Sequence, residues 1–129
     1  MMNTTQNNQI KKAHRLGGIK AGQHHWWLQR VTAIALIPLT LWVVFSLASL
    51  IGQDYRTVKI WFTLPHHTVL SVLFIVTAAY HASLGLQVIV EDYIHHLGIK
   101  QAVLNTLRLL LLLLGTLCTI VLLRLAFVS

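Results

Sequence analysis

Three uninterrupted apolar segments constrain the fold of this chain more than any other feature. They cover residues 31–51, 68–90 and 103–128. Each has the roughly 20 residues that a helix needs to cross the hydrocarbon layer of a bilayer. Only 10% of the 129 residues are charged, against about 25% in a typical soluble domain. The sequence therefore predicts an all-α integral membrane protein with three transmembrane helices.

Strands do not compete with this prediction, because strict alternation of apolar and polar residues is absent. A lone open sheet would also leave its backbone groups unpaired in lipid. Pro38 lies inside the first apolar segment and removes one backbone hydrogen bond there. We therefore expect a kink in the first span.

The first thirty residues form a polar, basic tail. They contain no acidic residue, and residues 3–23 show no apolar periodicity, so we expect them to be mobile or ordered only against a partner. The chain is therefore divided into a tail, residues 1–30, which ends near the interfacial motif HHWW, and a three-helix anchor, residues 31–129. An import signal fits the tail as well as a cytoplasmic segment does, whereas the first apolar segment is too long for a secretory signal peptide.

Basic residues predict the orientation of the chain. The side shared by the tail and the second loop carries Lys11, Lys12, Arg15, Lys20, Arg30, Lys100 and Arg108, whereas the other side carries Arg56, Lys59 and Arg124. This imbalance places the amino terminus in the cytoplasm, or in the matrix if the membrane is mitochondrial. The net charge of +7 does not indicate a nucleic-acid partner, because no basic domain stands apart from the spans. We attribute the charge to topology and to lipid headgroups.

An ionisable side chain, His81, lies well inside the second span, and such a residue marks a functional site by default. At about 100° per residue, one stripe of the helix contains Ala78, His81, Gly85, Val88 and Asp92. The small residues beside the imidazole leave two interpretations open. They admit a closely packed neighbouring helix, to which His81 would hydrogen-bond, or they leave room for a flat macrocycle whose iron the imidazole binds.

A six-coordinate haem at His81 would need a second ligand from another chain. The first and third spans contain no His or Met, and the methionines are Met1 and Met2. The interfacial histidines are too far along the bundle to lie across a ring from His81; they are His24, His25, His95 and His96. A haem site would therefore be shared with a partner chain.

Three polar residues lie at the cytoplasmic ends of the first two spans. Asp92 and Tyr93 are about 16 Å along the helix from His81, and Arg30 is on the same side of the membrane by topology. Ordinary interfacial roles fit all three residues. A quinone site also fits, because the phenol donates a hydrogen bond to a carbonyl and the carboxylate fixes a cation or delivers protons. Arg30 would then pair with Asp92 or with an anionic group such as a haem propionate.

The stretches HHWWLQRVTAIAL and HASLGLQVIVEDY resemble the smaller of the two hydrophobic membrane-anchor subunits of succinate dehydrogenase, or complex II. The spacing H-x₃-G-x₆-D-Y is the specific part of this resemblance. It implies that His81 is an axial ligand of haem b, with the second axial histidine on the other anchor subunit. It also implies that Tyr93 contacts ubiquinone, that Asp92 lies beside that site, and that Arg30 lies near the haem propionates and the quinone pocket.

The resemblance implies an anchor without chemistry of its own. Its partners would be the other anchor subunit, an iron–sulfur subunit and a flavoprotein subunit that oxidises succinate, in a bacterial cytoplasmic (inner) membrane or a mitochondrial inner membrane. Two alternatives remain open. One is the anchor of a quinol:fumarate reductase, which runs the reaction in the opposite direction. The other is a non-redox scaffold or assembly protein in which His81 only forms an interhelical hydrogen bond.

Overall fold

The computed structural model describes residues 3–128 and contains only helices in that range. In chain order they are α1 (Thr4–Leu50), α2 (Tyr55–Thr63), α3 (Pro65–Tyr93) and α4 (Leu97–Phe127). Three of them, α1, α3 and α4, are long and apolar enough to cross a membrane. The predicted all-α fold with three spans is confirmed.

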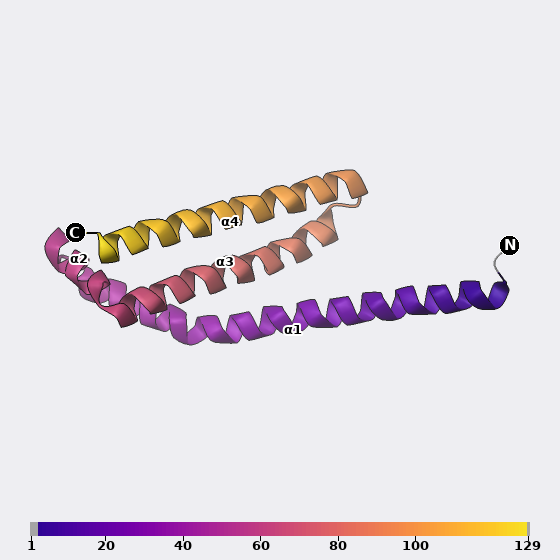
Figure 1. Ribbon diagram of the computed structural model, residues 1–129, viewed down its shortest axis with the longest axis horizontal. Helices are drawn as coiled ribbons and strands as arrows, with labels where there is room; N and C mark the ends of the chain where they lie inside the picture. Colours follow the sequence, from indigo (N-terminus) through magenta and orange to yellow (C-terminus); the bar gives the residue numbers. More distant parts are fainter. Residues whose placement is uncertain (1–2, 129) are drawn as a thin grey trace.

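The expected tail and the first span form one helix, α1. This helix has 47 residues, and its amino-terminal half projects past the connection between α3 and α4 (Figure 1). Residues 3–24 are exposed along their whole length, yet the chain is helical from Thr4. The structure thus differs from the first of the two expected states, a mobile tail, and does not bear on order against a partner. Extending a helix costs much less than starting one, and the Lys, Gln, Ala and Leu residues of this segment favour helix even though no apolar face guides it.

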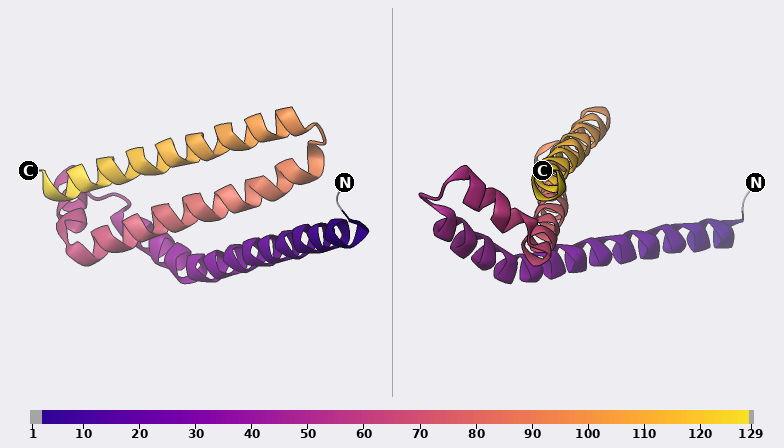
Figure 2. Two further views of the ribbon diagram at one scale, coloured as in Figure 1. Left: turned by 45° about the vertical axis from the view of Figure 1, so that its right-hand side comes forward. Right: turned by 60° about the vertical axis from the view of Figure 1, so that its left-hand side comes forward.

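α1 bends within its membrane-spanning half, the part that contains Pro38 (Figure 2). Proline has no backbone N–H to donate to the carbonyl four residues earlier, and its ring displaces that carbonyl. Beyond the bend the helix ends at Leu50, and Gly52 follows with a φ of 79°. Glycine adopts this left-handed conformation at no steric cost, so the chain can turn directly into α2.

α2 is a short amphipathic helix that closes one end of the bundle. The carboxylate of Asp54 caps it by accepting a hydrogen bond from the backbone N–H of Thr57 at 3.2 Å. Trp61 of α2 stacks on His67 of α3, with ring centroids 3.8 Å apart, and on Trp42 of α1, at 5.8 Å. These aromatic contacts join three helices at the end opposite the α3–α4 connection (Figure 1).

α3 is the central helix of the bundle. It packs against α1 on one side and against the antiparallel α4 on another (Figures 1 and 2). Few side chains of the described residues are buried: Leu39, Thr68, Leu84, Val90, Leu104 and Ala126. The three spans therefore do not enclose a core of their own. Most of their apolar surface is left for lipid or for other chains.

The cap of α2 predicts a pH dependence. Thr57, first through its hydroxyl and then through its backbone N–H, holds the pKa of the Asp54 carboxyl below its usual range. Because the folded-state pKa is lowered, the charged cap stabilises α2 above the ordinary carboxyl pKa, and this stabilisation is lost as the pH falls through the folded-state pKa. We expect Asp54→Ala to speed amide hydrogen exchange in α2 at neutral pH and to have a smaller effect below the folded-state pKa, where Asp54 keeps a capping oxygen without the charge.

The matched control is Asp54→Asn, which keeps a capping oxygen without the charge. It should retain most of the protection at neutral pH and lose the pH dependence. Equal exchange in wild type, Asp54→Ala and Asp54→Asn at neutral pH would contradict the capping role.

Candidate functional site

His81 lies where α3 meets α1. Its ring nitrogen Nδ1 is 2.9 Å from the hydroxyl oxygen, Oγ1, of Thr32. The imidazole is half-buried, and its other ring nitrogen, Nε2, is neither hydrogen-bonded nor fully buried within residues 3–128. The histidine therefore uses one nitrogen inside the chain and leaves the other free for a group from outside it.

The predicted stripe on α3 faces α1 at Gly85 as well. A Cβ atom added to Gly85 would lie 3.8 Å from Nε2 of Gln29, which is ordinary van der Waals contact. The hydrogen bond from His81 to α1 is the contact that the helix-packing interpretation predicts. The packing of α1, however, does not by itself require a glycine at position 85.

The face of α1 that meets α3 carries polar residues at helical spacing. Thr32 and Gln29 contact α3 directly, and His25 lies on the same face by its spacing. The Nε2 atom of His25 is buried without a hydrogen-bond partner. The seam between α1 and α3 is thus more polar than the hydropathy of the two spans indicates.

Asp92 and Tyr93 lie at the end of α3 and are both exposed; Tyr93 retains 80% of its accessible surface. The helix ends at Tyr93, and the backbone N–H of Ile94 donates to the carbonyl of Val90 at 2.9 Å. The two side chains are therefore held on the same rigid helix as His81. They are presented at the surface of the chain and not inside a cavity that it forms alone.

Arg30 does not reach Asp92. Its guanidinium carbon lies 4.4 Å from the ring centroid of Trp26, one turn earlier on α1, in a cation–π contact. Arg30 is exposed and forms no ion pair with the residues that the structure describes. The helix geometry explains this, because Arg30 precedes Thr32 by two residues, about 200° around the helix, and so points away from α3. Within the described residues the guanidinium therefore contacts Trp26 and not Asp92.

A hydrogen-bond network that sequence reasoning missed joins α3 to α4. Arg108 donates to Oε1 of Gln87 at 2.9 Å, and Nε2 of Gln87 donates to Oε1 of Glu91 at 2.8 Å. The ammonium of Lys100 also donates to the backbone carbonyl of Glu91 at 3.4 Å. The network fixes α3 against α4 one turn before Asp92 and Tyr93. No local motif signals it, because Gln87 and Arg108 are on different helices.

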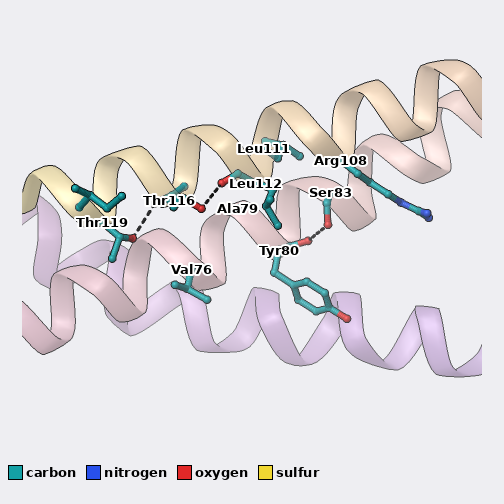
Figure 3. A pocket seen from close by; sticks show the side chains of 11 residues that line it. Val76, Ala79, Tyr80, Ser83, Arg108, Leu111, Leu112, Thr116 and Thr119 are labelled. Atoms are coloured by element: carbon teal, nitrogen blue, oxygen red, sulfur yellow. Dashed lines mark hydrogen bonds between the residues drawn. The ribbon is translucent and has the colours of Figure 1, made fainter.

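A groove of about 470 Å³ lies between α3 and α4 (Figure 3). The Ser and Thr hydroxyls in it donate to carbonyls of their own helices, as Thr116 does to Leu112 at 2.7 Å and Ser83 does to Tyr80 at 2.7 Å. The groove is therefore apolar in character. None of the site residues predicted from the sequence lines it, so it is separate from the His81 seam.

The fold and the site together define a helical membrane protein whose polar groups lack partners within the chain. Nε2 of His81 is free within a span, and Asp92 and Tyr93 are exposed at the end of α3. Over residues 4–123 the chain matches the family described as "Succinate dehydrogenase/Fumarate reductase transmembrane subunit", and it belongs to that family. It is 34% identical over 101 residues to the succinate dehydrogenase hydrophobic membrane anchor subunit of Rickettsia bellii. The aligned residues are 78% of this chain and 81% of the relative.

Two further relatives have matching names. The succinate dehydrogenase membrane anchor subunit of Reclinomonas americana is 37% identical over 79 residues, 59% of this chain and 66% of the relative. The corresponding hydrophobic membrane anchor subunit of Paracoccus denitrificans is 29% identical over 83 residues, 64% of each chain. No solved structure matches the chain. The predicted class, a membrane-anchor subunit of succinate dehydrogenase, is confirmed.

The surroundings of Gly85 predict the outcome of adding a methyl group there. If contacts with α1 alone limited the size of the side chain at position 85, Gly85→Ala would be tolerated, because the new Cβ makes only an ordinary contact with Gln29. An alanine in a helix interior is also favoured over glycine by up to about 1 kcal/mol. We expect the thermal unfolding midpoint of the purified chain to stay level or to rise.

The matched control is Gly115→Ala, whose new Cβ would lie 3.6 Å from Cβ of Ala79 in the seam between α3 and α4. A large fall in the midpoint for Gly85→Ala, but not for Gly115→Ala, would show that Gly85 serves helix packing within the chain.

Proposed function

We propose that this chain holds haem b together with a second anchor subunit and forms part of the ubiquinone site of succinate dehydrogenase. Electrons from succinate oxidation would reach the quinone at this membrane anchor. The observation that carries the proposal is the state of His81, whose Nδ1 is held by Thr32 while Nε2 remains free inside a span. Nitrogen of a neutral imidazole is a common axial ligand of haem iron.

The donor set of the chain fits half of a haem site. Among the described residues no group of three or more His, Cys, Asp or Glu side chains is placed to hold a metal ion. A haem needs only axial ligands, however, because the macrocycle itself supplies the other four. His81 would give one axial nitrogen, and the partner anchor subunit would give the other. A free nitrogen at the surface of the chain suits a site that two chains share.

When bound, haem b supplies one-electron redox chemistry, and the residues of this chain would position it and its surroundings. His81 would bind the iron through Nε2. Arg30 would contact a propionate or another anionic group of the quinone pocket, because its guanidinium is exposed at the entrance of the span and is held only by Trp26.

Tyr93 would orient the quinone. Its phenol is free and exposed at the end of α3, where it is able to donate a hydrogen bond to a quinone carbonyl. Asp92 would lie beside the pocket, where an exposed carboxylate is suited to fix a cation or to relay protons from water. The chain would form only one wall of this pocket, and the other anchor subunit and the iron–sulfur subunit would form the rest. The flavoprotein subunit would oxidise succinate beyond them.

The distribution of charge supports an orientation with the amino terminus in the cytoplasm or matrix. The projecting half of α1 and the α3–α4 connection lie toward the same end of the bundle (Figure 1). The projecting half carries Lys11, Lys12, Arg15 and Lys20, and Lys100 and Arg108 lie in the first part of α4, whereas the other end carries Arg56, Lys59 and Arg124. By the positive-inside rule the basic end faces inward. The membrane would be a bacterial inner membrane, as suits the relatives from Rickettsia and Paracoccus, with a mitochondrial inner membrane as the alternative.

The family description includes fumarate reductase, so the opposite direction of electron flow is the second candidate. The three relatives described above are named as succinate dehydrogenase subunits, which favours succinate oxidation. The same names also favour a subunit of a redox complex over a non-redox scaffold.

His81→Leu tests the haem proposal. In the detergent-purified complex, the variant should lose the low-spin b-type signal in a reduced-minus-oxidised visible spectrum, because the axial nitrogen is removed. The subunits should still copurify, since leucine preserves the apolar span. The matched control is His66→Leu, which changes an exposed histidine near the start of α3 and should keep the signal. A normal haem signal in His81→Leu would refute the ligand role.

Tyr93→Phe tests the quinone proposal. Loss of the phenol hydroxyl removes one hydrogen bond to the quinone, which is worth roughly 1 kcal/mol and corresponds to about a fivefold effect. Succinate:quinone reductase activity should fall, or the apparent KM for quinone should rise, while haem content and electron transfer to a soluble acceptor stay normal. Tyr55→Phe, at the other end of the bundle, is the control. Unchanged quinone turnover and KM in Tyr93→Phe would place the pocket elsewhere.

A further inference from the structure

The Thr32 hydroxyl makes three short contacts but has only one proton to share. Its Oγ1 atom lies 2.8 Å from the carbonyl oxygen of Leu28, 3.0 Å from that of Gln29 and 2.9 Å from Nδ1 of His81. The first two contacts are local to α1, whereas the third joins two helices across 49 positions of sequence. The position of the protons at Thr32 therefore decides the chemistry of His81.

One arrangement of protons satisfies all three contacts. Carbonyl oxygens only accept hydrogen bonds, so the hydroxyl must donate to Leu28 and Gln29, in a shared hydrogen bond of the kind common for threonine in helices. Its oxygen then accepts from an N–H at Nδ1 of His81. In the opposite arrangement the hydroxyl donates to Nδ1 of His81. The lone pairs of the Thr32 oxygen would then face two carbonyl oxygens at hydrogen-bonding distance, with no proton between them.

A neutral imidazole with its proton on Nδ1 has its lone pair on Nε2. In His81 this is the nitrogen that is free at the surface of the chain. We propose that Thr32 is a positioning residue, which fixes the tautomer and the ring orientation of His81 so that Nε2 is always ready to bind the haem iron. The inference rests on the proposed haem site at His81 and adds to it a residue on a different helix.

The hydrogen bond also sets the electronic character of the ligand. An acceptor on the N–H of a metal-binding imidazole makes the ring more basic. The Thr32 oxygen is a good acceptor because its own proton is engaged by carbonyls, and hydrogen bonds in such a chain strengthen one another. A more electron-rich imidazole favours ferric over ferrous iron. Thr32 should therefore hold the haem midpoint potential lower than an apolar residue at this position would.

The test uses the whole purified complex with Thr32→Val, which keeps the branched shape and removes the hydroxyl. Redox titration of the b-type visible signal should show a shift of the midpoint potential to a more positive value, and the g values of the ferric haem in electron paramagnetic resonance should change with the ring orientation. Haem loss to excess apomyoglobin should be on the order of tenfold faster, the lower end of the effect seen when such supporting residues are removed.

Two variants serve as controls. Thr32→Ser restores the hydroxyl and should return the potential and the g values to those of wild type. Thr116→Val removes a hydroxyl that makes the same kind of bond, to Leu112 at 2.7 Å, but the structure gives Thr116 no contact with a histidine. It should leave the haem unchanged. If Thr32→Val does not accumulate, Thr32→Ala provides the same measurement.

The outcomes separate this inference from the proposed function. Wild-type potential, g values and haem retention in Thr32→Val, beside a loss of haem in His81→Leu, would overturn the role of Thr32 and leave the haem site standing. A loss of complex stability in Thr32→Val with unchanged haem properties would show a merely structural hydrogen bond and would also overturn it. A haem signal retained in His81→Leu would refute the haem site itself.

Discussion

The exclusion of water from the hydrocarbon layer is the constraint on which this structure depends. Every backbone N–H and C=O inside the membrane must find its partner within the chain, and helices achieve this locally. The same exclusion makes any polar side chain in a span costly unless it is bonded. Thr32 meets this requirement through carbonyls of its own helix, whereas His81 meets half of it through Thr32. The other ring nitrogen of His81, Nε2, has no hydrogen-bond partner among the described residues.

The packing of the helices points in the same direction. Three helices arranged with α3 in the middle bury little of one another's surface, and only a few side chains of the described residues are buried. In water such an arrangement would not be stable. In a membrane, lipid covers apolar surface without penalty, so the polar features decide where other chains bind. Those features are the seam around His81, the projecting half of α1 and the end of α3 at Asp92 and Tyr93.

The sequence predicted the parts of the structure that depend on local rules. Hydropathy and length located the three spans, and the depth of His81 marked it as a candidate site. The helical form of residues 4–23 was missed because this segment contains glycines and polar residues without apolar periodicity. In the structure it continues α1. An interhelical hydrogen bond of His81 was one of the two open interpretations, but its partner, Thr32, was missed because it depends on the relative rotation of two helices. The same rotation separates Arg30 from Asp92, a pair that topology alone had placed together.

The continuity of α1 gives this small subunit a mechanical property. Between Lys11 and Thr32 the helix has no proline, so a continuous hydrogen-bonded helix about 32 Å long connects its projecting half to the seam between α1 and α3. A tilt or rotation that a bound protein imposed on the projecting half would be carried along this helix toward the Thr32 hydroxyl, to the extent that Gly17, Gly18 and Gly22 leave it stiff. Under the proposed function, docking of water-soluble subunits on this half would then be linked to the geometry of the histidine, and the order of assembly would depend on the stiffness of the helix. Pro38 lies beyond Thr32, so the bend would reduce the transfer of such a motion to the far end of the bundle.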